Sequence, residues 1–138
     1  MELLIVFVII AIGAALMAPN IGGWLPNYRL RSATRDVASI MRVAQLRAVA
    51  TNTSFRISFD TLNDSYIVEY LTTGGGWVAD GAPQTLPSGV KFITSFAGNI
   101  TTFSPNSTAT DGNVTLNNTK GSIKTVRLLG LTGRIRVE

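Results

Sequence analysis

The chain contains no cysteine and no histidine. Without cysteine it has neither disulfides nor thiolate metal sites, so cysteine usage indicates no redox compartment. Without histidine it lacks the most common general base and the most common metal ligand, and cysteine would have been the best nucleophile. Only carboxylates remain for enzyme chemistry. The composition therefore argues against an enzyme, and it predicts neither a cofactor nor a metal site.

Charged residues are also scarce, at 14% of the chain, and they are unevenly placed. Residues 29–51 carry five arginines against one aspartate, and residues 120–138 carry five basic residues against one glutamate. The stretch between these zones is acidic on balance. Two separate basic zones favour two different roles, although a solvated surface would give the same pattern.

One apolar run dominates the sequence. Leu3 to Ala18 are sixteen consecutive apolar residues or glycines, and no later stretch approaches this length. As a helix the run would extend about 24 Å, less than the hydrocarbon core of a bilayer at about 30 Å. It fits the apolar part of a secretory signal, a membrane anchor, or a helix that leaves the membrane for a protein assembly.

Glu2 favours the third role. A carboxylate at the head of a membrane helix is unfavourable without a partner, and signal peptides begin with positive charge instead. The free N-terminal amine of a neighbouring subunit would provide that partner. The run is therefore interpreted as a helix that joins copies of itself.

The end of the apolar run carries residues that interrupt helices. Pro19 and Pro26 each remove a helix hydrogen bond, and Gly22 and Gly23 weaken the stretch between them. We expect the helix to be broken or loosened within residues 15–26. This stretch is either a plain linker or a segment that lets the helix adapt inside an assembly.

Helical periodicity returns from Asn27. Apolar residues recur at intervals of three or four on one face, which should pack under a sheet: Leu30, Ala33, Val37, Ile40, Met41, Ala44 and Ala48. Arg31, Arg35 and Arg42 fall on another face, where they are solvated, pair with neighbouring subunits or, less favourably, contact lipid headgroups. The helix should end near residues 51–53.

Strands are expected from residue 54 onwards. Residues 54–71 alternate as a β-hairpin that turns at 61–64. Further strands are expected near 90–96, 101–103, 114–116, 122–129 and 134–137, with loops at 74–76 and 83–89. A long helix followed by an antiparallel sheet is an α+β fold. We therefore divide the chain into a membrane or filament-core helix (1–26), its amphipathic second half (27–53) and a β-rich head (54–138).

Residues 2–15, followed by Ala18-Pro19, resemble the N-terminus of mature type IV pilins and type II secretion pseudopilins. In that family a prepilin peptidase removes a leader, the new N-terminus is methylated, and the glutamate neutralises the N-terminal amine of an adjacent subunit. The resemblance implies assembly roles for Glu2, Met1, Pro19 and Pro26. Four residues usually precede the family's glutamate, whereas only Met1 precedes Glu2 here.

The rest of the chain resembles the GspH/FimT branch of minor pilins, through residues 30–47, the hairpin residues 55–59 and the closing residues 131–137. The resemblance implies a structural subunit that polymerises into a type IV pilus or type II secretion-like filament. Its partners would be further copies and other pilins. Its location would be the bacterial inner membrane before assembly, and then the cell surface, an extracellular filament or a periplasmic pseudopilus.

The chain closes with Gly133-Arg134-Ile135-Arg136, which is expected to form a strand. Alternate residues share a face, so Arg134 and Arg136 should point one way while Ile135 and Val137 point inward. The two guanidinium groups, about 6.8 Å apart, would each meet a phosphate of an extended nucleic acid strand. The tail thus resembles the Gly-Arg-x-Arg tail with which FimT-type pilins capture DNA.

Three further basic residues lie close in sequence and would widen this DNA-binding patch: Lys120, Lys124 and Arg127. Paired arginines on an edge strand also discourage aggregation between sheets, so the structural alternative stays open. The tail has no aromatic side chains on which bases of a single strand would stack.

Two polar features of the sequence, a pair of aspartates and a set of sequons, each have two interpretations. Asp60 and Asp64 flank the hairpin turn, where their oxygens would bind calcium or, as we expect, cap the turn. Six Asn-x-Ser/Thr sequons would accept glycans on the head of a secreted protein, or arise by chance in an Asn- and Thr-rich chain: Asn52, Asn63, Asn99, Asn106, Asn113 and Asn117.

Overall fold

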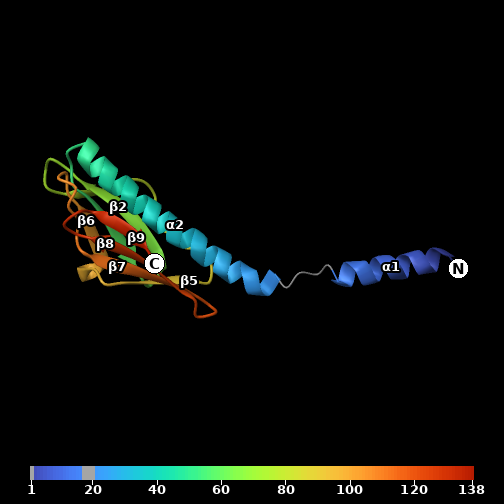
Figure 1. The fold of residues 1–138 in the computed structure, drawn as a ribbon. Coiled ribbons are helices and arrows are strands. Elements are labelled where there is room, and N and C mark those ends of the chain that lie inside the picture. Colours follow the sequence, from blue (N-terminus) through green and yellow to red (C-terminus); the bar gives the residue numbers. More distant parts are fainter. Residues whose placement is uncertain (1, 17–20) are drawn as a thin grey trace.

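A computed structural model describes residues 2–16 and 21–138 of the chain. Two helices, α1 (Glu2–Leu16) and α2 (Ile21–Ala50), precede a head of antiparallel strands (Figure 1). The expected α+β fold is therefore confirmed. The helix that carries the head ends at Ala50, close to the expected end near residues 51–53.

The helix α1 is apolar around its whole circumference. Ten large apolar side chains from Leu3 to Leu16 have exposed fractions between 51% and 83%. The head therefore does not bury this helix. None of the helices in the described part of the chain is both long enough and apolar enough to cross a membrane.

The expected break within residues 15–26 falls partly on residues 17–20, which lie outside the described residues; α1 ends at Leu16 and α2 begins at Ile21. Pro19 lies outside the described residues. Pro26 lies inside α2, so the helix is not broken there. It is the sixth residue of α2, so its missing N–H removes one hydrogen bond near the start of the helix instead of in its middle.

The helix α2 lies along the strands of the head and contacts both sheets (Figure 1). The predicted apolar face is confirmed, since all seven of its residues are buried except Ile40, which is half-buried. Thr34 and Ala38 are buried as well, because sheets on two sides cover more than one stripe of the helix. The Thr34 hydroxyl donates to the Leu30 carbonyl at 2.7 Å, which satisfies this buried group.

The strands form two antiparallel sheets. The first has the order β3-β2-β1-β6, with β4 also paired to β2: β1 (Phe55–Asp60), β2 (Ser65–Leu71), β3 (Trp77–Ala79), β4 (Gln84–Thr85) and β6 (Ile100–Phe103). The second has the order β5-β7-β8-β9: β5 (Val90–Thr94), β7 (Gly112–Asn118), β8 (Ile123–Leu129) and β9 (Arg134–Val137).

The expected hairpin is confirmed, with Phe55 paired to Tyr70 and Asp60 to Ser65. The division into two sheets was not predicted, because sequence alternation indicates strands without indicating which strands pair. β4 lies within the stretch 83–89 that was predicted as a loop. Its two residues are too few for alternation to be visible.

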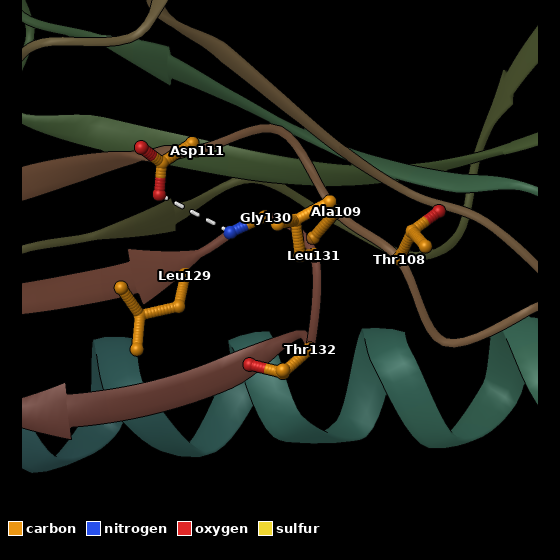
Figure 2. A pocket seen from close by; sticks show the side chains of 7 residues that line it. All are labelled: Thr108, Ala109, Asp111, Leu129, Gly130, Leu131 and Thr132. Carbon is orange, nitrogen blue, oxygen red and sulfur yellow. Dashed lines mark hydrogen bonds between the residues drawn. The ribbon is translucent and has the colours of Figure 1, made fainter.

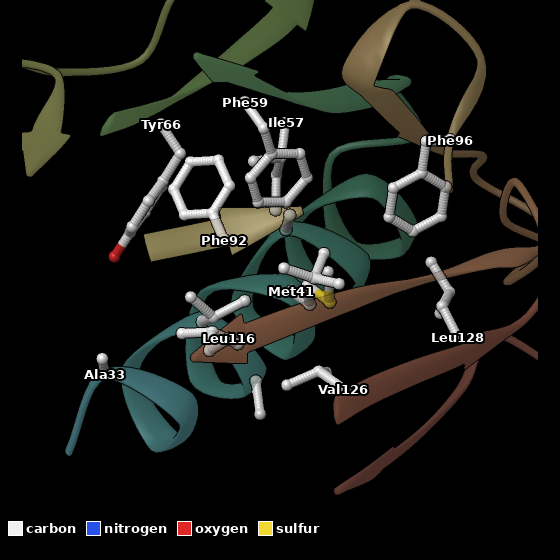
Figure 3. Close-up of a cluster of buried hydrophobic side chains, with 14 of the residues drawn as sticks. Ala33, Met41, Ile57, Phe59, Tyr66, Phe92, Phe96, Leu116, Val126 and Leu128 are labelled. Atoms are coloured by element: carbon white, nitrogen blue, oxygen red, sulfur yellow. The ribbon is translucent and has the colours of Figure 1, made fainter. Parts of the chain in front are cut away.

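Aromatic side chains join the two sheets in the core (Figure 3). Phe59 of β1 meets Phe92 of β5 edge-on, with ring centroids 5.5 Å apart, and stacks on Phe96 at 6.1 Å. Met41 of α2 and Ile57 of β1 are fully buried in the same cluster. The head therefore has a closed apolar core of its own, formed without α1.

Candidate assembly helix and basic surfaces

The first candidate site is the exposed surface of α1. A helix that is apolar on every side is stable only when protein or lipid surrounds it. Glu2 is the first residue of α1, at the end of the helix remote from α2 in sequence. Of the other residues assigned to assembly, Met1 and Pro19 lie outside the described residues, and Pro26 lies in α2.

The second candidate site is an outer arginine surface, formed by Arg127, Arg134 and Arg136. Arg127 of β8 pairs directly with Arg136 of β9, and Arg134 pairs with Leu129. All three arginines are exposed and point to the face of the sheet opposite α2. Three cations on one small face create a positive surface that suits an extended anion.

The inward residues of β9 are less covered than expected. Ile135 is half-buried and packs against the core. Val137 points toward α2, but 46% of it is exposed. It occupies the end of an edge strand, where only one neighbouring strand covers it.

Lys124 and Lys120 do not extend the outer arginine surface. Lys124 pairs with Leu116, whose side chain faces the core, so Lys124 points toward α2. It lines a hollow of about 280 Å³ together with Arg31, Thr34, Arg35 and Val137. We call Arg31, Arg35 and Lys124 the cationic hollow.

Lys120 lies in the turn between β7 and β8, beside the start of α2. Its Nζ is 3.4 Å from the position that a β-carbon on Gly23 would occupy. Asn27 anchors the same turn, because its Oδ1 accepts hydrogen bonds from Asn118 Nδ2 at 2.8 Å and from the Ser122 hydroxyl at 3.1 Å. The structure thus separates the five predicted basic residues into two groups on opposite faces.

The glycine of the Gly-Arg-x-Arg tail has a packing role. Gly133 is buried and has a positive φ of 59°. A β-carbon there would collide with the Gln45 side chain and with the Ser107 carbonyl oxygen. Only glycine lets the turn before β9 approach α2 this closely.

An exposed aromatic pair on α2 was not recognised from the sequence as a site. Trp24 and Tyr28 stack with ring centroids 5.0 Å apart, and their exposed fractions are 65% and 54%. Their spacing of four residues on a helix is the signal that would have indicated the pair.

A hollow of about 750 Å³ lies between the turn after β8 and the segment before β7 (Figure 2). Seven residues line it: Thr108, Ala109, Asp111, Leu129, Gly130, Leu131 and Thr132. Its one carboxylate accepts a hydrogen bond from the Gly130 N–H at 3.1 Å, through Asp111 Oδ1. The seven lining residues include no second titratable side chain that could act with Asp111 in general acid–base catalysis.

The turn after β1 uses the Asp60 carboxylate as a cap. Oδ1 accepts from the N–H groups of Leu62 at 3.0 Å and Asn63 at 3.1 Å, and Oδ2 accepts from Asn63 Nδ2 at 2.6 Å. The hydrogen bond from the Asn63 side chain, followed by the two backbone bonds, lowers the pKa of Asp60. The turn-capping interpretation is confirmed for Asp60. It is not confirmed for Asp64, whose Oδ1 is buried without a hydrogen-bond partner among the described residues.

The six sequon asparagines differ in accessibility. Asn52, Asn63 and Asn106 are exposed, and the other three are half-buried. Asn99 Oδ1 accepts a hydrogen bond from the Thr94 hydroxyl at 2.5 Å. The glycan and the chance interpretations of these sequons both stay open, and a glycosylating enzyme would reach the three exposed positions most readily.

The helix that packs along antiparallel sheets places the chain in the class of pilin-like folds. No protein-family model matches the sequence, and no curated protein is similar to it. The minor pseudopilin EpsH from the type 2 secretion system of Vibrio cholerae has the same fold, with a TM-score of 0.70 and 12% sequence identity. The match covers 80% of this chain and 96% of that one.

Two further solved structures are similar. The type IV minor pilin FimU of Pseudomonas aeruginosa has a TM-score of 0.65 and 18% identity, covering 81% of this chain and 90% of that one. GspH of E. coli has a TM-score of 0.65 and 13% identity, covering 81% and 89%. The resemblance to the GspH-like branch is confirmed at the level of the fold.

Proposed function

We propose that this chain is a structural subunit, not an enzyme, that polymerises through α1 into a type IV pilus or type II secretion-like filament. The observation that carries this proposal is the exposed apolar surface of α1, attached to a head whose core is complete without it. The pilin-like fold shared with minor pilins and pseudopilins supports the same role.

Burial of α1 provides the driving force for assembly. Each large apolar side chain contributes about 1.5–3 kcal/mol when fully buried, and ten such side chains in α1 are more than half exposed. Their burial among neighbouring helices therefore supplies at least about 10 kcal/mol before the entropy of association is subtracted. Before assembly, the same surface would be covered by the inner membrane.

Glu2 would set the position of each subunit in the filament. An isolated carboxylate among packed apolar helices is unfavourable, and the N-terminal amine of an adjacent subunit would neutralise it. Other pilins with the same N-terminal pattern would join by the same contact. The finished filament would lie at the cell surface or, as a pseudopilus, in the periplasm.

The test is the Glu2→Gln variant of the full chain, examined by sedimentation and electron microscopy of assembled material. We expect filaments to disappear from the pellet because the amine loses its charged partner. Glu138→Gln serves as the matched control, since it removes one exposed carboxylate at the other end of the chain. Normal filaments from the Glu2→Gln subunit would refute the role of this residue.

A second candidate function is DNA binding, as in FimT-like minor pilins. The outer arginine surface favours it, because Arg127 and Arg136 are cross-strand neighbours and Arg134 shares their face. The double variant R134A/R136A should weaken DNA binding and reduce the slope of log K against log salt by about 0.7–0.9 for each lost phosphate contact.

The double variant R42A/K91A removes the same charge from exposed positions outside the outer arginine surface and the cationic hollow, and it should leave DNA affinity nearly unchanged. Binding is measured by fluorescence anisotropy with single- and double-stranded oligonucleotides across a salt series. If the wild-type chain does not retain DNA at low salt, this second function is excluded.

A further inference from the structure

One side of the first turns of α2 carries aromatic and cationic side chains in a fixed order. Trp24, Tyr28, Arg31 and Arg35 are spaced by four, three and four residues, so they share one strip of the helix. All four are exposed, and the two aromatic rings stack on each other. We call these four residues the α2 strip.

A residue from the head joins the cationic end of the α2 strip. Lys124 of β8 lines the same hollow as Arg31 and Arg35. Among the described residues, the ion pairs are Arg47–Asp80 and Arg56–Glu69, so none of these three cations has an acidic partner there. Their mutual repulsion is relieved when an anion enters the hollow.

The nearest acidic residue in sequence faces elsewhere. Asp36 lines a different hollow that includes Tyr66. Burial, and to a smaller extent the Asp36 carboxylate, raise the pKa of Tyr66. Among the described residues no carboxylate pairs with the cationic hollow, which leaves it open to an anion from outside the head.

We propose that the α2 strip and Lys124 bind the phosphate headgroups of an anionic membrane and hold the subunit at the membrane surface before assembly. This inference rests on the proposed residence of α1 in the membrane. Along the chain, the order is apolar helix, aromatic pair, then cations. The same order is found from the hydrocarbon core through the interface, where tryptophan and tyrosine concentrate, to the lipid phosphates.

The dimensions agree with this assignment. Arg31 lies about 10 Å along the helix from Trp24, at 1.5 Å per residue. Side chains on a helix tilt toward its N-terminus, and a long arginine extends further in that direction to reach the headgroups. The fifteen residues of α1 form a short apolar segment, so contacts at the interface would add to its retention.

An acidic neighbour would meet the cations without using the exposed aromatic pair. A single nucleic acid strand would stack its bases on the rings, but it does not explain why the pair lies between the apolar helix and the arginines. Free inorganic phosphate fits the hollow chemically, yet it makes no use of Trp24 and Tyr28. Anionic lipid is the one ligand of this set that uses both parts of the strip and also explains their order next to the apolar helix.

The experiment uses the fluorescence of Trp24 in the full chain carrying Trp77→Phe, which leaves one tryptophan. The protein is reconstituted into vesicles of phosphatidylcholine, with or without phosphatidylglycerol, whose acyl chains are brominated close to the headgroup. We expect a blue-shifted emission and strong quenching when phosphatidylglycerol is present. R31Q/R35Q should reduce the quenching to the level found with phosphatidylcholine alone.

Two controls make the result specific. R134Q/R136Q removes the same charge from the outer arginine surface and should leave the quenching unchanged. Trp24→Phe, with Trp77 retained in the head, should show no quenching. Inorganic phosphate added to phosphatidylcholine vesicles should not change the Trp24 emission.

Several results would overturn the inference. Equal quenching in both kinds of vesicle would show that the cations do not select anionic lipid, and equal loss in both double variants would show attraction by net charge alone. A response to inorganic phosphate would assign the hollow to the free ion. An emission that shifts only in assembled filaments would assign the strip to a second copy.

Flotation with vesicles distinguishes a failure of the proposed function from a failure of the lipid contact alone. If the protein does not float with vesicles of any composition, α1 does not insert into membranes, and the proposed lipid contact is refuted as well. If it floats and forms filaments while Trp24 stays unquenched, the filament proposal stands and the lipid contact alone is refuted.

Discussion

The two helices of this chain use apolar residues in opposite ways. In α1 they surround the helix and are exposed. In α2 they form one broad stripe, which both sheets cover. The head therefore uses α2 to complete its own core and leaves the apolar surface of α1 for something outside the subunit.

This difference separates stability from assembly. Substitutions on the buried stripe of α2 act on the fold of the head, because those side chains pack against Phe59, Leu116 and their neighbours. Substitutions on α1 act on contacts that exist only with lipid or another subunit. If the two helices are independent in this way, matched substitutions in α1 and α2 should change different properties of the protein.

The largest effect is expected from Val37→Asp, at a fully buried position of α2. An unpaired carboxylate in the core costs about 4 kcal/mol or more, which approaches the total stability of a small domain. The head should be unfolded or strongly destabilised in thermal unfolding followed by circular dichroism. Ile9→Asp, the matched change on α1, should leave the unfolding midpoint of the head unchanged while it abolishes filaments.

Met41→Ala should cost about 2–5 kcal/mol, because the fully buried thioether leaves a cavity between α2 and the sheets. Urea unfolding measures this loss as a lower midpoint at unchanged slope. The exposed Leu46, one turn further on, provides the control, since Leu46→Ala should change the stability by less than about 0.5 kcal/mol. Equal losses in the two variants would contradict the assignment of faces.

Gly133→Ala should destabilise the head by about 1–3 kcal/mol. The residue has a positive φ, and the new methyl group would meet Gln45 and Ser107. Gly75→Ala is a useful comparison, because Gly75 also has a positive φ but has open space around it. Stability to urea should fall further for Gly133→Ala than for Gly75→Ala.

The smallest effect is expected for the stability that the β1–β2 turn contributes through Asp60, which should depend on pH. The pKa of Asp60 in the folded head lies below its ordinary value of 3.8, so the ionised carboxylate stabilises the turn. This contribution is fully present above 3.8 and is lost as the pH falls through the lower folded pKa. Thermal midpoints of the wild type and Asp60→Asn should therefore differ slightly at neutral pH and converge in acid; a constant difference would refute the linkage.

The order of elements and the buried face of α2 could be predicted from the sequence, because both follow from local periodicity. The expected core face of α2, with six residues buried and Ile40 half-buried, and the hairpin at 54–71 are confirmed for this reason. The two-residue strand β4 was missed because it is too short to show alternation.

The arrangement of the basic residues could not be predicted, because it depends on strand parity and on packing between distant segments. Lys124 and Arg127 are close in sequence, yet an odd spacing on β8 directs them to opposite faces. The meeting of Lys124 with Arg31 depends on how α2 crosses the second sheet. The glycine of the tail was predicted as part of a DNA motif, and its close approach to Gln45 became visible only in three dimensions.

The most direct test of the difference between the helices is site-specific photo-crosslinking from α1. Phe7, which is 67% exposed, is replaced by a benzoyl-phenylalanine in the full chain. In assembled material, the probe should form covalent dimers of the subunit, and in detergent-dispersed subunits it should not. Assembled filaments in which the Phe7 probe reacts only with lipid or detergent would contradict the claim that neighbouring subunits cover α1.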